Sequence, residues 1–175
     1  GRGPVAKAQK RLIDNLRSAM PDVALRSSFI VGFPGETEAE FQELLSFLAE
    51  VRFDHVGIFS YSAEEGTPAA QLPDQVPEAI KEERYKRAMK LQQEISEKKN
   101  QARVGQTYEV IIDGPCEETD LVLVARSQYQ APDVDGVIYI GNRWLPAGEL
   151  APARIIQGHS YDLVAEIMEV RGDTP

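Results

Sequence analysis

The segment from Phe29 to Thr37 has the residue types of a ligand-binding turn. Its sequence is Phe-Ile-Val-Gly-Phe-Pro-Gly-Glu-Thr. A β-rich run ends at Gly32, whose missing Cβ lets a ligand or another backbone approach closely. Pro34-Gly35 favours a tight turn, and the following helix begins at the sheet edge where parallel strands end and ligands bind. The same residues also fit a strand-to-helix turn that holds no ligand.

The single thiol and two imidazoles of the chain offer little metal or nucleophile chemistry. Cys116 alone excludes an internal disulfide framework and any iron–sulfur site built from several thiolates of this chain. With only His55 and His159 beside it, a self-contained zinc site is disfavoured as well. We therefore assign no catalytic residue and no metal ligand from the sequence.

Charge is distributed unevenly along the 175 residues. The chain carries 19 Lys and Arg against 28 Asp and Glu, a net charge of −9. Residues 101–175 hold five Arg, no Lys and 12 acids, a net charge of −7, whereas residues 1–100 sum to −2. Nucleic-acid surfaces neutralise phosphates with clustered Lys and Arg. The composition therefore disfavours nucleic acid and favours a basic protein as partner.

The composition is that of an ordinary globular protein, with 42% hydrophobic and 27% charged residues. No apolar run reaches the ~20 residues of a membrane span, and no signal peptide opens the sequence. We expect a cytoplasmic protein without a membrane partner.

Two strands and two helices must position the turn. Apolar residues at helical spacing predict a helix over residues 4–20, and residues 23–32 are typical of a strand. Thr37 and Glu40 predict a capping box that begins an amphipathic helix, and residues 54–62 form a second strand. A strand–helix–strand unit makes the strands parallel. Two parallel strands are no finished sheet, and the sequence begins without Met. Another chain completes the sheet, or the chain is a fragment of a larger α/β protein.

The hydrophobic period changes near residue 104. Residues 78–103 predict one charged helix of about 26 residues. Five short strands within residues 104–171, separated by Gly, Pro and Asn turns, predict a small OB-like β-barrel. The last of them, residues 161–170, can also be read as a helix.

Three features, in this order, resemble the C-terminal half of the radical S-adenosylmethionine methylthiotransferases. They are SSFIVGFPGETEAEF, then HVGIFSYSAEEGTPAA, then a long helix before a small β-domain; Gly1-Arg2-Gly3 is similar to the end of the family's MGRG segment. The resemblance implies the last two βα units of a partial TIM-like radical-SAM barrel over residues 1–76, a connecting helix over 77–103 and a TRAM β-barrel domain over 104–171. The fold class is then α/β followed by all-β.

The resemblance also implies S-adenosyl-L-methionine and [4Fe–4S] clusters as cofactors of the full-length enzyme. The family's cluster-binding CxxxCxxC motif is absent, and Cys116 matches none of the family's cluster ligands. We therefore expect this fragment to bind neither cofactor and to be inactive by itself.

Two branches of the family differ in substrate. One methylthiolates an aspartate β-carbon of a basic small-subunit ribosomal protein, and the other modifies an adenosine in tRNA. The acidic, lysine-free β-domain and the sequence of residues 24–28 favour the ribosomal-protein branch. The tRNA branch, and a non-enzymatic adaptor that docks a basic protein, remain the alternatives.

The resemblance also implies which residues of this chain line the cofactor site. Ser28, Ile30 and Gly32 match the Gly-x-Ile-x-Gly-like strand that packs near the adenine, with Ser in the first position. Arg26 is a candidate for the methionine carboxylate if it shares a strand face with Ser28 and Ile30. In the family's general pattern an acidic residue follows this strand, and Glu36 lies one position later than that residue. We therefore interpret Glu36 as a helix cap. Packing within the barrel is the alternative role for each of these residues. For Arg26 the alternative is a charge exposed on the surface.

The last barrel strand and the loops of the β-domain supply the other expected contacts. Phe59, Ser60 and Tyr61 end the strand that usually gives backbone contacts to the adenine. Acidic loop residues and one Trp are expected to meet the basic substrate protein. They are Glu117, Glu118, Asp120, Asp133, Asp135 and Trp144. Solubility is the alternative for the acids, Glu149 among them, and rim packing for the Trp.

Overall fold

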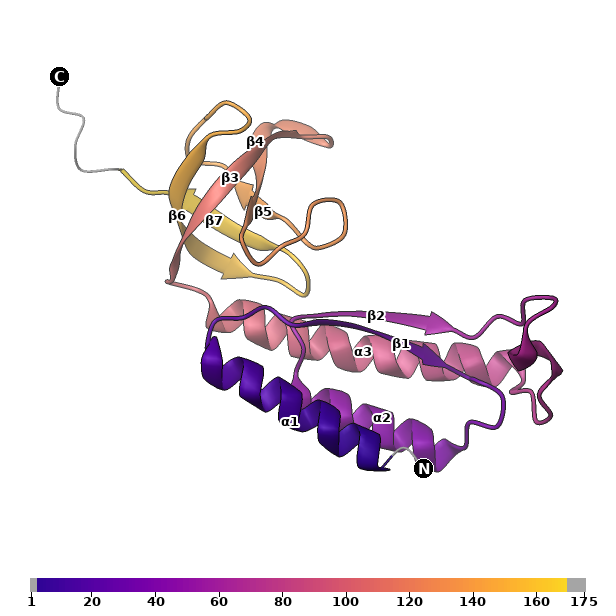
Figure 1. Ribbon diagram of the computed structural model, residues 1–175. Coiled ribbons are helices and arrows are strands. Elements are labelled where there is room, and N and C mark those ends of the chain that lie inside the picture. Colours follow the sequence, from indigo (N-terminus) through magenta and orange to yellow (C-terminus); the bar gives the residue numbers. More distant parts are fainter. Residues whose placement is uncertain (1–2, 170–175) are drawn as a thin grey trace, which may run out of the picture. The chain divides into compact units, whose positions relative to one another are not determined.

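The computed structural model describes residues 3–169, in two compact units that divide at residue 95 (Figure 1). Of the described residues, 3–95 belong to the first unit and 96–169 to the second. Gly1 and Arg2 of the MGRG-like segment lie outside the described residues. So do residues 170–171 of the expected β-domain, which include the final residue of the strand predicted over residues 161–170.

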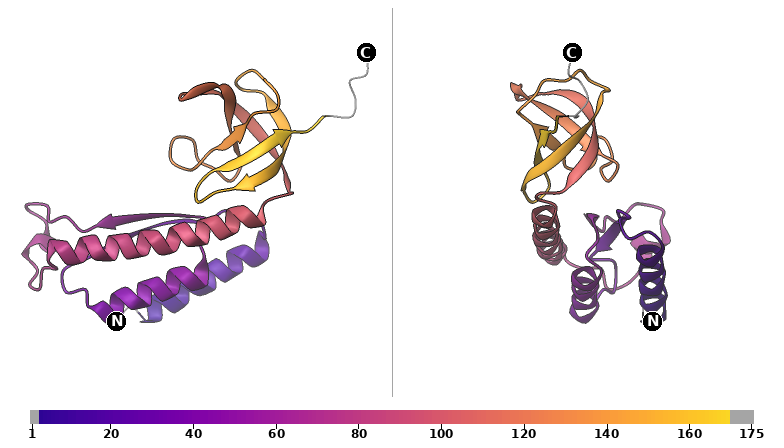
Figure 2. Two further views of the ribbon diagram at one scale, coloured as in Figure 1. Left: turned by 180° about the vertical axis from the view of Figure 1, so that it is seen from behind. Right: turned by 90° about the vertical axis from the view of Figure 1, so that its left-hand side faces the viewer.

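In the first unit, helices cover a parallel pair of strands. The elements are α1 (Gly3–Ala19), β1 (Arg26–Val31), α2 (Glu38–Val51), β2 (His55–Ser60), the short 3-10 helix η1 (Pro68–Gln71) and the first part of α3 (Glu78–Ala102). β1 and β2 pair in parallel along their whole length. The predicted strand–helix–strand unit is therefore confirmed. Figures 1 and 2 show α1 and α2 on the same side of the two strands.

Local chemistry sets both ends of α2. Thr37 Oγ1 accepts a hydrogen bond from Glu40 N at 3.2 Å, and the Glu40 carboxylate accepts one from Thr37 N at 2.9 Å. The predicted capping box is confirmed. The helix ends at Val51, and Arg52 caps it: Arg52 has a left-handed backbone (φ 51°) and donates its N–H to the Leu48 carbonyl. The fully or nearly fully buried core of this unit consists of Ile13, Val31, Phe41, Leu48, Val51, Phe53, Ile58 and Ala88.

Within residues 96–169, five strands close into a barrel. They are β3 (Thr107–Cys116), β4 (Thr119–Ser127), β5 (Ile138–Ile140), β6 (Leu150–Gly158) and β7 (Leu163–Ile167), in the order β3-β4-β5-β7-β6. The predicted five-stranded barrel is confirmed. Its last segment is a strand, because Leu163, Ala165 and Ile167 alternate into the core. The helical reading of that segment is wrong.

One helix, α3, spans the division between the units. It runs unbroken over 25 residues, in agreement with the single charged helix predicted over residues 78–103. Within the second unit, Asn100 Nδ2 donates to the His159 carbonyl at 2.9 Å, and a Cβ on Gly158 would lie 2.4 Å from the Asn100 carbonyl carbon. Glycine at 158 therefore lets the helix end touch the β6–β7 turn. No helix within residues 3–169, α3 included, is long and apolar enough to cross a membrane.

Candidate functional site

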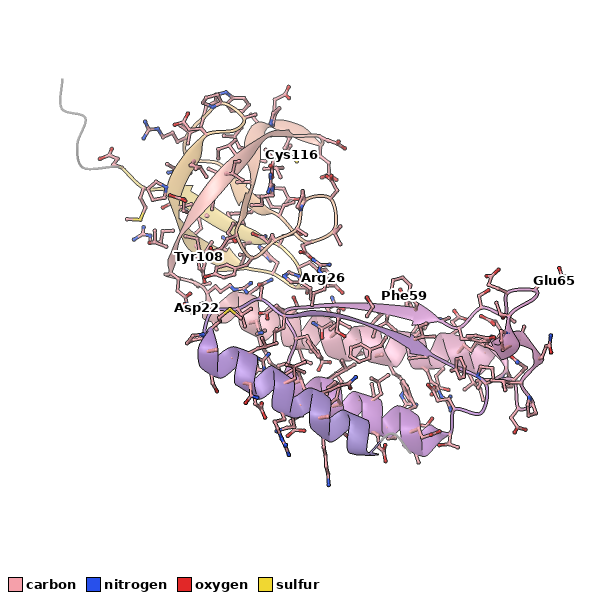
Figure 3. All side chains as sticks on the ribbon, in the orientation of Figure 1. Asp22, Arg26, Phe59, Glu65, Tyr108 and Cys116 are labelled. Carbon is pink, nitrogen blue, oxygen red and sulfur yellow. The ribbon has the colours of Figure 1, made fainter. Side chains whose placement is uncertain are left out.

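One face of the β1–β2 pair is open to solvent and combines a hydroxyl with apolar surface. Arg26, Ser28 and Ile30 are exposed along β1 while the residues between them are not, so the three share this face. Phe59 of β2 lies opposite Ile30, and each is 57% exposed. The Phe59 ring covers Gly57, which pairs with Ser28. In Figure 3, Phe59 points away from the helices of this unit.

The loop after β1 is buried and tied to α3. Glu36 Oε1 accepts a hydrogen bond from Gly32 N at 2.9 Å and pairs with Arg84 Nη1 at 2.8 Å. Gly32 has a left-handed φ of 74°, and a Cβ there would lie 2.4 Å from Lys81 Cγ. The space beside Gly32 is therefore filled by a side chain of this chain. Thr37 is the residue that caps α2, so the interpretation of Glu36 as a helix cap is wrong.

Tyr61 follows β2 into the same buried region. Its N–H donates to the Val31 carbonyl at 2.9 Å, and its ring packs edge-on against Phe33, with centroids 5.2 Å apart. The Lys81 ammonium lies 5.4 Å from the ring centroid, within the range of a cation–π contact. Within residues 3–169, the buried phenolic oxygen has no hydrogen-bond partner. Tyr61 is thus buried, whereas Ser60, one residue earlier, is exposed.

Two buried cations near this loop, Lys81 and Arg84, were not predicted from the sequence. Their side chains are 10% and 5% exposed, although residues 78–103 have the composition of a solvated helix. The spacing of charged residues along the helix does not reveal which are buried. Glu82 and Lys86, for example, form an exposed pair one turn apart on the same helix. Only the packing of α3 against the loop after β1 distinguishes the buried cations from the exposed ones.

The connections of the barrel divide the predicted acidic residues between its two ends. β4 is antiparallel to both β3 and β5, so the β3–β4 turn and the loop after β5 lie at one end. Four of the predicted substrate-binding residues are exposed at this end, and we call them the acidic rim. They are Glu117, Glu118, Asp120 and Trp144. Asp133 and Asp135 lie between β4 and β5, at the opposite end, and Asp135 accepts a hydrogen bond from the Ala131 N–H at 2.7 Å within that loop.

Two large apolar side chains are exposed at the same end of the barrel as the carboxylates of the acidic rim. Trp144 is 60% exposed, and Leu121, near the start of β4, is 83% exposed. Packing at the barrel rim therefore leaves most of Trp144 uncovered. Leu121 was not predicted as a site residue, because a single outward Leu in a strand is common. Exposed aromatic and aliphatic side chains surrounded by charges are typical of protein-contact surfaces.

Tyr139 on β5 has a raised pKa, and burial is its main cause. Burial raises the pKa of Tyr139 above 10.0, and Asp162, Cys116 and Glu118 raise it further. Because the folded state favours the protonated phenol, its contribution to stability is complete below pH 10.0 and is lost as pH rises through the raised pKa. Tyr139→Phe is expected to reduce alkaline unfolding and to remove a tyrosinate absorbance with a midpoint above pH 10.0. Identical alkaline titrations of the two proteins would contradict this.

Comparison with known proteins assigns the barrel to a class. Residues 104–168 match the TRAM domain family. The closed β3–β7 barrel is therefore a TRAM domain.

Curated relatives extend the match over most of the chain. It is 52% identical over 158 residues to the ribosomal protein uS12 methylthiotransferase RimO of Syntrophotalea carbinolica, covering 90% of this chain and 35% of that protein. The RimO proteins of Desulforamulus reducens (48% over 168 residues; 95% and 38%) and Geobacter sulfurreducens (49% over 159 residues; 91% and 36%) match similarly. The chain is thus homologous to RimO methylthiotransferases and spans a little over a third of their length. The resemblance found in the sequence is confirmed.

Proposed function

We propose that this chain is part of a methylthiotransferase that modifies an aspartate β-carbon of ribosomal protein uS12, a basic small-subunit protein. The observation that carries the proposal is the 52% identity, over 90% of this chain, with a protein named for acting on uS12. In this proposal residues 1–76 form part of the wall of the radical-SAM barrel, and residues 104–171 recognise the substrate protein. Residues 77–103 connect these two parts. In this proposal the enzyme acts in the cytoplasm, as a ribosomal substrate implies.

The open face of β1 and β2 suits S-adenosyl-L-methionine. Ile30 and Phe59 offer adjoining apolar surface for a purine ring, and the Ser28 hydroxyl beside Gly57 offers a hydrogen bond. Arg26 on the same face offers a cation to a carboxylate. When bound, S-adenosylmethionine supplies the radical chemistry together with iron–sulfur clusters, and the residues of this face bind and orient it.

The residues of this chain do not fit an iron–sulfur cluster. Among residues 3–169, no three His, Cys, Asp or Glu side chains lie close enough to hold a metal ion. The single thiol, Cys116, is half-buried at the end of β3, and a [4Fe–4S] cluster needs several thiolates. In this proposal the cluster ligands lie elsewhere in the longer polypeptide.

The acidic rim is the part of the TRAM domain that we assign to the basic substrate. Its carboxylates are exposed, and Leu121 and Trp144, exposed at the same end of the barrel, offer apolar anchors. Complementary charge raises the rate of encounter and orients the partner, while buried aromatic anchors supply most of the affinity. Lysine is absent from residues 101–175, which argues against RNA as the partner of this surface.

The test is binding of the chain to uS12 and, separately, to a tRNA anticodon stem-loop, at low and moderate salt. Glu117→Lys/Glu118→Lys is expected to weaken uS12 binding about tenfold at low salt, with a smaller effect at moderate salt. The matched control is Glu64→Lys/Glu65→Lys, an adjacent exposed pair in the first unit that receives the same charge change. An equal loss of uS12 affinity in both variants would show that the acidic rim does not recognise the substrate protein. Binding of the stem-loop instead of uS12 would favour the tRNA branch.

A further inference from the structure

A buried ion pair joins Glu36, in the loop after β1, to Arg84 of α3, which lies 48 residues later in the sequence. Arg84 Nη1 donates to the Glu36 carboxylate at 2.8 Å and also to the Glu36 carbonyl oxygen at 3.1 Å. The same carboxylate oxygen accepts the Gly32 N–H at 2.9 Å. The Arg84 and Glu36 side chains are 5% and 2% exposed, so water weakens these contacts little.

Further contacts hold the same loop from other directions. Gly35 N donates to a carbonyl of the segment before α3 at 2.9 Å, and Tyr61 N donates to the Val31 carbonyl at the end of β1. The Lys81 methylenes fill the space beside Gly32. The loop is therefore tied to α3, to the segment before it and to the end of β2.

We propose that Arg84 is a positioning residue for the cofactor face, an inference that rests on the function proposed for that face. Acting through Glu36, it holds the Gly32 amide and so sets the direction in which β1 continues beyond Ile30. A buried ion pair adds little net stability over a well-packed apolar pair. Its directional hydrogen bonds, however, fix a geometry that apolar packing leaves less defined. The pair thus orients the end of β1, where the Ile30 side chain lies on the open face.

The chain offers a matched control for Arg84. Arg87 lies three residues later on α3, and both guanidinium groups lie over the Phe41 ring, at 5.5 Å for Arg84 and 4.9 Å for Arg87. Both also pair with Glu38, at 3.7 Å and 3.1 Å. Only Arg84 reaches Glu36. Arg84→Lys and Arg87→Lys therefore make the same chemical change, and the first alone removes the two-point contact with the loop.

The first measurement is amide hydrogen exchange of the 175-residue chain, followed residue by residue by NMR. Arg84→Lys is expected to speed exchange at Gly32 about tenfold, because its N–H loses a fixed acceptor, while Arg87→Lys leaves it unchanged. Glu36→Gln is the second variant and is expected to raise exchange at the same amide. Unchanged exchange at Gly32 in both Arg84→Lys and Glu36→Gln would overturn the proposal.

The second measurement is equilibrium binding of S-adenosylmethionine to the full-length enzyme that contains this segment. Arg84→Lys is expected to weaken binding about tenfold and to raise KM more than it lowers kcat, with Arg87→Lys as the unchanged control. Faster Gly32 exchange with unaltered affinity would overturn the positioning role. If the unaltered enzyme binds no S-adenosylmethionine, the proposed function of the face fails. The exchange result still decides separately whether Arg84 holds the loop.

Discussion

Arg84→Met is expected to lower the free energy of unfolding of the first unit by about 3–5 kcal/mol, the usual result of breaking a buried ion pair by removing one partner. The variant leaves the Glu36 carboxylate with 2% exposure and without its cation. The Gly32 N–H still donates to that carboxylate, but one neutral donor does not offset a buried charge.

The two units allow the effect of Arg84→Met to be located. Far-UV circular dichroism in urea follows mainly the helices, most of which lie in the first unit. The fluorescence of Trp144, the single tryptophan, follows the TRAM barrel. We expect the dichroism transition to move and the fluorescence transition to stay. In a double-mutant cycle with Glu36→Gln, a coupling energy below about 0.5 kcal/mol would contradict the ion pair.

Gly32→Ala is expected to destabilise the first unit by about 2–4 kcal/mol, because two penalties act at one residue. Alanine at a φ of 74° is strained, and its Cβ would lie 2.4 Å from Lys81 Cγ. The Lys81 side chain is 10% exposed and packs beside Tyr61, so its methylenes have little room to move aside. Urea unfolding followed by circular dichroism measures the loss.

Gly35→Ala is the matched control for Gly32→Ala. Gly35 has a similar φ of 80°, but nothing lies within 4 Å of a Cβ built there. The variant therefore carries the backbone penalty alone, about 1 kcal/mol. Equal losses at the two glycines would show that Lys81 yields without cost, and that the close approach at Gly32 is not required.

Several features follow from local patterns in the sequence. The capping box at Thr37 and Glu40 is confirmed, because both partners lie within one helical turn. The parallel pairing of β1 and β2 follows from the helix between them, and the five-stranded barrel follows from period-two segments separated by turn residues. These features depend on contacts between residues close in sequence, or on periodicity, and a single sequence contains both kinds of information.

Other features of the site depend on the tertiary structure. Glu36 has the residue type and the sequence position of a helix cap, yet it pairs with an arginine 48 residues away. Charge alone does not separate the buried Arg84 from the exposed Lys86 on the same helix. Strand order likewise places Glu117 and Asp133 at opposite ends of the barrel, although both are acidic loop residues. The sequence by itself determined which elements form and which family they resemble. Only the packing of distant segments decided which charges are buried and which loops lie together. The free energy of burying a charged side chain depends on its tertiary neighbours, and no local pattern specifies those neighbours.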